Sequence, residues 1–298
     1  MNTCIFCHKD SSLSTSVEHI IPESLGNKHH IIPRGYVCDE CNNYFGKKIE
    51  QVLLSQPYFI SLRFRNEIRN KKDKLVKDNI YIPEINKYVE CTFETKEDKI
   101  AISFDDKEIF EQIKNGNIKS FVNLKISEPE YPSSIMSRFL AKCAYEFFLY
   151  NMGEENYDDC VTDLLGKEND ILKNLREYAR YGNSNKKIWQ YYQRRTQSEG
   201  TIRHNRFSGR YQEIIHKMML FCREYEKISE EDIKAEIYFI MEIAGIEYAI
   251  CISDPNISGY IEWLKENGGV SPLNEKDDNI LPYSLSNMNP FLISKKGN

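Results

Sequence analysis

The sequence has no long apolar run. None of its segments approaches the roughly 18 to 20 consecutive apolar residues that a helix needs to cross a bilayer. The first residues, MNTCIFCHKD, lack the apolar stretch of a secretory signal. The chain also contains no internal repeat and no low-complexity tract. We therefore expect a cytoplasmic protein that has no membrane partner.

An overall excess of positive charge is also missing. The net charge of −5 argues, as an average, against a nucleic-acid-binding protein. The average hides one basic segment, residues 173–217, with 11 Lys and Arg against 3 Asp and Glu. Because phosphate binding depends on the local field, this segment counts for more than the average.

The length and the residue pattern indicate more than one domain. At 298 residues the chain is long for one domain and comfortable for two. Strands and turns are expected up to about residue 36, followed by a helix, capped by Asn42 or Asn43, that ends near residue 56. We predict domains over residues 1–57, 58–130 and 131–298.

The remaining segments predict a mixed α+β chain. Residues 58–77 form a basic arm in which Ile60, Leu62 and Phe64 alternate like a strand or the end of a linker. Residues 78–130 are strand-rich, and helices are expected over 133–151, 158–180 and 186–195. Strands follow over 215–225, 235–243 and 246–252, the last two joined as a hairpin, and a short helix is expected over 257–266.

Four of the nine cysteines form two C-x-x-C pairs, Cys4 with Cys7 and Cys38 with Cys41. Four thiolates complete the tetrahedral shell of a structural zinc and leave no position open for water. A disulfide or a chance spacing is the alternative, and an intracellular chain disfavours the disulfide. The other five cysteines fit small buried apolar residues.

The segment between the cysteine pairs carries a second set of polar residues. It contains Glu18-His19-Ile20-Ile21-Pro22, and Asn42 follows Cys41 directly. The pattern C-x2-C … E-H-I-I-P-E-S-L-G … V-C-x2-C-N-x2-F-G resembles the HNH endonuclease family in its zinc-bound ββα-metal form. The resemblance covers residues 4 to about 54, under a fifth of the chain.

The resemblance implies roles for three residues. His19 is similar to the histidine that deprotonates the attacking water, and Glu18 and Asn42 match the ligands of one catalytic divalent cation, Mg²⁺ or Mn²⁺. The chemistry agrees, because a neutral histidine is an apt base near pH 7 and Mg²⁺ takes few protein oxygen ligands. The expected fold is therefore a small zinc-stapled ββα-metal module followed by a larger α+β domain with a helical middle and a C-terminal β-hairpin.

The sequence departs from the family pattern in two places. The acidic residue is often Asp in the family, and Glu18 is one methylene longer. The middle Asn of the family name normally precedes the third cysteine, where this chain reads IIPRGYVC. Asn27, His29 or His30 could replace it, and the sequence assigns none of them.

The basic segments supply candidate phosphate contacts. In these segments cationic and aromatic residues alternate, and such residues can bind phosphates and stack on bases. The alternative is a helical layer whose aromatic residues form the core and whose Arg residues face acidic neighbours. The candidate nucleic-acid contacts are Arg63, Arg65, Lys186, Lys187, Arg194 and Arg195.

The predicted function is a metal-dependent HNH endonuclease that cuts DNA, with RNA as a possible substrate. Resemblance to defence-associated HNH proteins implies a bacterial defence or mobile-element effector. The alternatives are a non-catalytic zinc-knuckle module that binds nucleic acid or protein, and an RNA-cutting toxin. A homo-oligomer or a regulatory partner is expected to control the activity, with residues 131–298 as the recognition or regulatory domain.

Overall fold

The computed structural model describes residues 3–70, 72–96, 99–122, 132–152, 170–182, 188–195, 202–204, 211–213, 216–227 and 233–274. By internal packing the chain divides into two compact units. The first comprises residues 1–21, 29–49 and 132–298, and the second comprises residues 22–28 and 50–131. The predicted domain boundaries near residues 57 and 130 remain predictions.

The predicted β-β-α order is present at the N-terminus. Strand β1 (Glu18–His19) pairs antiparallel with β2 (Ile31–Ile32), and helix α1 (Asp39–Phe45) follows. A π-helical turn, η2 (Gly46–Glu50), and helix α2 (Gln51–Leu54) come next along the chain. The cap prediction was wrong, because Cys38 caps α1 by accepting a hydrogen bond from the backbone N–H of Cys41.

The C-terminal sheet of the first unit is antiparallel, with strand order β6-β11-β10-β9. The strands are β6 (Tyr191–Arg195), β9 (His216–Lys227), β10 (Ile233–Ile243) and β11 (Ile246–Cys251). The predicted hairpin is confirmed: β10 pairs with β11, and the turn residues Ala244 and Gly245 have φ of 49° and 82°. Positive φ at both positions suits a tight two-residue turn.

One helix prediction was wrong. Residues 191–195 lie within the predicted helix 186–195, yet they form the edge strand β6. Tyr191 pairs with Ile250 and Tyr192 with Ala249, so β11 supplies the hydrogen-bonding partners that the sequence pattern does not reveal.

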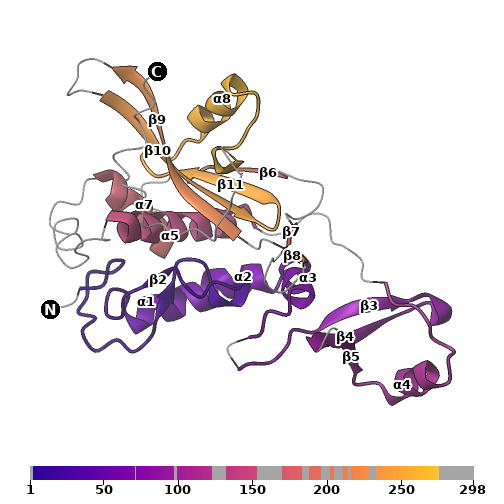
Figure 1. Cartoon of the computed structure of the whole chain (residues 1–298). Coiled ribbons are helices and arrows are strands. Elements are labelled where there is room, and N and C mark those ends of the chain that lie inside the picture. Colours follow the sequence, from indigo (N-terminus) through magenta and orange to yellow (C-terminus); the bar gives the residue numbers. More distant parts are fainter. Residues whose placement is uncertain are drawn as a thin grey trace. The chain divides into compact units, whose positions relative to one another are not determined.

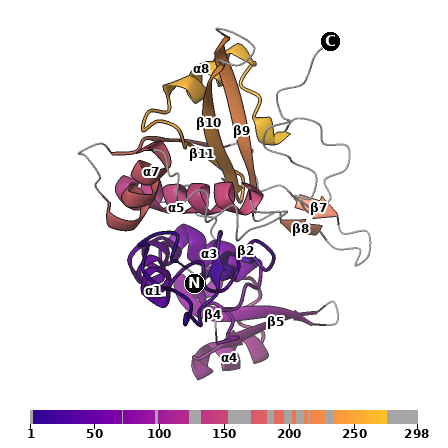
Figure 2. The ribbon, with the colours of Figure 1, turned by 90° about the vertical axis from the view of Figure 1, so that its left-hand side faces the viewer.

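Helices cover both faces of this sheet. Alternate residues of a strand face opposite sides, and Phe239 packs on Phe147 of α5 (Ser133–Met152) with ring centroids 5.5 Å apart. On the opposite face Tyr238 packs on Tyr260 of α8 (Ser258–Glu266) at 5.5 Å. Figures 1 and 2 show that α5 lies between the sheet and the elements β2 and α1 of the same unit.

Helix α7 (Asp170–Tyr181) packs beside α5, and the two helices overlap the predicted helical segments 158–180 and 133–151. The first part of the predicted helix 158–180 lies outside the described residues. Short elements complete the unit: β7 (Ile202–His204), β8 (Tyr211–Glu213) and η4 (Pro272–Asn274). Among the described residues, no helix is long and apolar enough to span a bilayer.

The second unit is a three-stranded antiparallel sheet with helices. Its order is β3 (Asp78–Ile82), β4 (Lys87–Lys96) and β5 (Lys99–Phe104), which confirms the predicted strand-rich segment. Ile82, Val89 and Ile109 of helix α4 (Lys107–Lys114) share one core cluster. The 3-10 turns are η1 (Glu23–Leu25) and η3 (Pro83–Ile85).

The prediction of a strand or linker after residue 57 was wrong. Residues Pro57–Arg65 form helix α3, with Pro57 in its first turn, where the missing N–H costs nothing. Tyr58, Phe59, Leu62 and Phe64 are buried, so the apolar residues follow a helical face and not a two-residue alternation.

Candidate metal centre and active site

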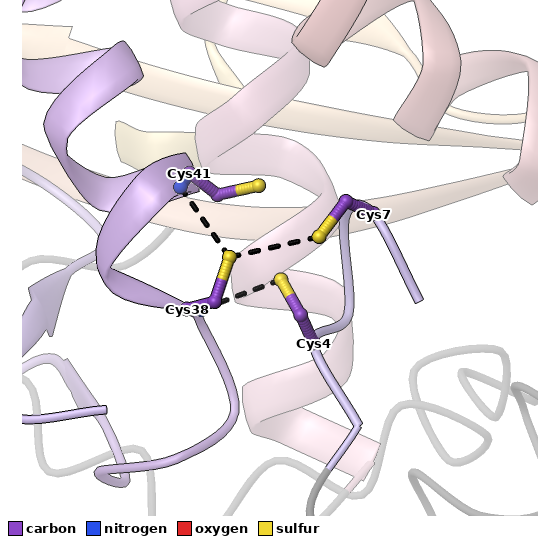
Figure 3. A group of neighbouring side chains, drawn as sticks. All are labelled: Cys4, Cys7, Cys38 and Cys41. Atoms are coloured by element: carbon purple, nitrogen blue, oxygen red, sulfur yellow. Dashed lines mark hydrogen bonds between the residues drawn. The ribbon is translucent and has the colours of Figure 1, made fainter. Parts of the chain in front are cut away.

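Cys4, Cys7, Cys38 and Cys41 gather at one point of the first unit (Figure 3). Their Sγ atoms all lie within 4.8 Å of one another, and Cys7 Sγ and Cys38 Sγ are 3.6 Å apart. A tetrahedral zinc with Zn–S bonds of about 2.3 Å requires S–S distances of about 3.8 Å. The cluster is therefore compatible with a structural zinc that joins the N-terminal loop to the start of α1.

Backbone geometry already prepares two of these sulfur atoms to carry negative charge. The N–H of Cys38 donates to Cys4 Sγ at 3.4 Å, and the N–H of Cys41 donates to Cys38 Sγ at 3.4 Å. Hydrogen bonds to a sulfur favour its thiolate form. Both C-x-x-C pairs therefore contribute a sulfur whose thiolate form a backbone N–H stabilises.

The four thiols do not ionise equally. A hydrogen bond with Cys41 lowers the pKa of Cys4 to about 4, whereas burial raises the pKa of Cys38 to about 11. The hydrogen bond with Cys4 raises the pKa of Cys41. One thiol of the group therefore ionises readily and two resist, so a bound dication must displace their protons.

The Glu18-His19 strand presents its two side chains differently. Glu18 is buried, with 5% of its surface exposed, whereas His19 is partly exposed. Adjacent residues of a strand point to opposite faces, which accounts for the difference. A partly exposed imidazole can reach a water molecule, and a buried carboxylate needs a partner.

Lys142 of α5 is that partner. Its Nζ lies 2.5 Å from Glu18 Oε1 and 3.3 Å from Glu146 Oε2, and it donates a hydrogen bond to the backbone oxygen of His19 at 2.9 Å. Lys142 and Glu146 are fully buried. One ammonium thus holds both the side chain of Glu18 and the main chain of His19.

Asn42 ties the start of α1 to the same strand. Its Nδ2 donates to the backbone oxygen of Val17 at 3.0 Å, next to Glu18 in the chain. The hydrogen bond therefore joins α1 to the residue that precedes the Glu18-His19 strand. The roles of Glu18, His19 and Asn42 in catalysis remain predictions.

The contacts from α5 and α7 were missed in the sequence. Helix α5 donates from Tyr145 to the backbone oxygen of Ile5 and from Cys143 to that of Ile20. Helix α7 donates from Arg176 to the backbone oxygen of Phe6. One feature of the sequence could have predicted part of these contacts. Lys142 and Glu146 lie four residues apart within an apolar helix, and this spacing predicts an ion pair on one helical face.

The candidate nucleic-acid contacts lie on different elements of the fold. Arg195 is exposed on β6, whereas Arg194 is mostly buried and forms a double hydrogen bond to Glu247 through Nε at 3.0 Å and Nη2 at 3.3 Å. In the second unit Arg63 and Arg65 lie in the last turn of α3 and are half-buried. Lys186 and Lys187 lie outside the described residues.

The three candidates for the missing middle Asn also differ in their surroundings. Asn27 is fully buried, and His29 is exposed. The backbone oxygen of His30 accepts from Ile20 N at 3.1 Å, so His30 lies beside the strand that carries His19. Burial lowers the pKa of His30. None of these observations assigns the role of the family's Asn.

The comparisons with known proteins give a match that covers the segment with the four clustered cysteines. Residues 4–57 match the family model described as HNH endonuclease. The matched segment includes Cys4, Cys7, Cys38, Cys41 and the Glu18-His19 strand. No curated protein and no solved structure matched the chain.

Proposed function

We propose that this protein is a metal-dependent HNH endonuclease that hydrolyses phosphodiester bonds in DNA, as a bacterial defence or mobile-element effector. The family match over residues 4–57 supports a nuclease in general terms. The observation that supports the proposal further is the hydrogen bond from Asn42 to the backbone oxygen of Val17, because it links α1 to the residue that precedes Glu18.

Three residues would perform the chemistry. His19 would take a proton from the attacking water, and its partial exposure allows water to reach it. Glu18 and Asn42 would hold Mg²⁺ or Mn²⁺, which prefer oxygen ligands. Such an ion would neutralise charge on the phosphate and on the leaving oxygen.

The charges around Glu18 fit a divalent cation. Glu18 would keep its ion pair with Lys142 while binding the metal. The ammonium alone would cancel the charge of Glu18, but Glu146 lies 3.3 Å from the same ammonium. When Glu18 and Glu146 are both ionised, two carboxylates around one lysine carry a net negative charge, which attracts a cation.

The direct test uses full-length protein that has been freed of contaminating nucleases. Incubation with supercoiled plasmid and Mg²⁺ or Mn²⁺ is expected to give nicked or linear DNA, and EDTA is expected to stop the reaction. The same assay on single-stranded RNA separates the RNA-cutting alternative. Failure to cut either polymer with either metal would support the non-catalytic zinc module instead.

The basic strand β6 supports a nucleic-acid surface at Arg195. Arg195→Glu is expected to weaken DNA binding and to lower the slope of log affinity against log salt by about one, because one phosphate contact is lost. Fluorescence anisotropy with a labelled duplex over a range of salt concentrations measures both quantities. An unchanged slope would exclude Arg195 from the binding surface.

Arg194 is not a suitable position for this binding test because its side chain stabilises the fold. Its guanidinium pairs with Glu247, which also accepts a hydrogen bond from Tyr260 at 2.9 Å. Reversing its charge would place two carboxylates together and unfold the edge of the sheet. Arg195 alone is therefore the informative position on β6, and Lys265→Glu on the exposed surface of α8, outside the basic segments, is the control.

The proposed nuclease activity would be regulated by the rest of the chain. We infer that residues 131–298 serve as the recognition or regulatory domain, through a homo-oligomer or a regulatory partner. The support is that Lys142 of α5 holds Glu18 and His19, so a rearrangement of α5 would reach the proposed catalytic residues directly.

A further inference from the structure

Arg180, near the end of α7, contacts the four-cysteine centre. Its Nε donates a hydrogen bond to Cys41 Sγ at 3.3 Å. The side chain comes from a residue 139 positions away in the sequence, and it is mostly buried. Cys41 itself is fully buried, so this cation replaces water as the donor to the sulfur.

The guanidinium of Arg180 is held in place from several sides. It lies 3.9 Å from the ring centroid of Tyr44, and its Nη2 is 3.5 Å from Glu40 Oε1. Arg138 of α5 donates to the backbone oxygen of Arg180 at 2.9 Å and to the hydroxyl of Tyr44 at 2.5 Å. A stacked and braced guanidinium loses little freedom when it binds the sulfur.

The contact with Arg180 would compensate the negative charge of the zinc site. A zinc ion with four thiolates carries a net charge of about −2, and burying such charge without compensation is costly. Cys4 and Cys38 each accept a backbone N–H, whereas Cys41 accepts the hydrogen bond of a full cation. Arg180 therefore supplies charge that the backbone donors do not.

We propose that Arg180 is an outer-sphere ligand of the zinc site, which binds the Cys41 thiolate and raises the affinity of the four cysteines for zinc. The inference rests on the proposed zinc and is independent of nuclease activity. Because Glu40, Cys41 and Tyr44 flank Asn42, the same contact positions the start of α1. The zinc site is thus completed by a helix outside the matched segment.

The test compares Arg180→Ala with Arg176→Ala in full-length protein. Arg176 lies one turn earlier on α7, is similarly buried and binds the backbone oxygen of Phe6 in the same N-terminal segment, at 2.8 Å. Competition with a chromogenic chelator measures zinc affinity. Loss of an outer-sphere partner typically weakens metal binding by about 10–100-fold, and we expect this for Arg180→Ala and less than a threefold change for Arg176→Ala.

Cobalt provides a readout that loss of packing would not change. With Co²⁺ in place of zinc, the thiolate-to-metal charge-transfer band is expected to shift in Arg180→Ala and to stay in place in Arg176→Ala. Arg180→Lys, which keeps the charge, should lose less affinity than Arg180→Gln. These two variants also carry the comparison if Arg180→Ala does not fold.

The outcomes separate the two proposals. Wild-type protein without zinc would overturn the proposed zinc site itself. Wild-type protein that holds zinc, with equal losses in the Arg180 and Arg176 variants and an unshifted cobalt band, would overturn the role of Arg180 alone. Plasmid cleavage does not enter either result.

Discussion

Replacement of His19 by alanine is expected to abolish metal-dependent DNA cleavage. A positioned general base contributes roughly 10²–10⁴-fold to a rate, and His19 is the proposed base. The side chain is partly exposed, so its truncation should remove little packing. Initial rates of plasmid nicking at saturating Mg²⁺ measure the effect, with zinc content and the melting temperature recorded for each protein.

Leu13→Ala is the control for this experiment. Leu13 lies in the same N-terminal segment and is 90% exposed, so its truncation should leave cleavage unchanged. A His19→Ala protein that retains zinc and cuts at the wild-type rate would rule out His19 as the base. A variant that loses zinc would instead point to a structural role for the strand.

Lys142→Met is expected to destabilise the first unit strongly. The substitution removes the ammonium that lies 2.5 Å from Glu18 and 3.3 Å from Glu146, and it leaves two buried carboxylates without that cation. Breaking a buried ion pair from one side typically costs about 3–5 kcal/mol. Urea denaturation followed by circular dichroism measures the free energy of unfolding.

Two further variants test the cause of this loss. Lys142→Met combined with Glu146→Gln should recover part of the stability, because one of the two uncompensated charges is gone. Lys173→Met on the exposed surface of α7 should change stability by less than about 0.5 kcal/mol. If the double variant is as unstable as Lys142→Met alone, the charge argument fails and lost packing explains the result.

Local patterns in the sequence were enough for several features. The C-x-x-C spacing predicted the four-cysteine cluster, and Ala244-Gly245 predicted the hairpin of β10 and β11. The helix over 133–151 is confirmed as α5. Each of these depends on residues that are close in sequence or on a motif whose chemistry fixes the partners.

Features that depend on distant partners were not readable in this way. The strand β6 was predicted as a helix because its hydrogen bonds go to β11, more than fifty positions later. Helix α3 was predicted as a strand or linker because its buried face becomes visible only once its neighbours are placed. Local propensity is a weak prior, and tertiary packing overrides it.

The sequence by itself determined which residues could form a zinc site, because metal ligands require particular side chains at particular spacings, and its resemblance to the HNH family implied the candidate catalytic residues. Only the tertiary structure showed that Lys142 binds Glu18 and that Arg180 binds Cys41. These partners lie 124 and 139 positions away and match no motif, and burial is what makes each of them necessary. A thiolate or carboxylate removed from water needs a cation, and the fold decides which one reaches it.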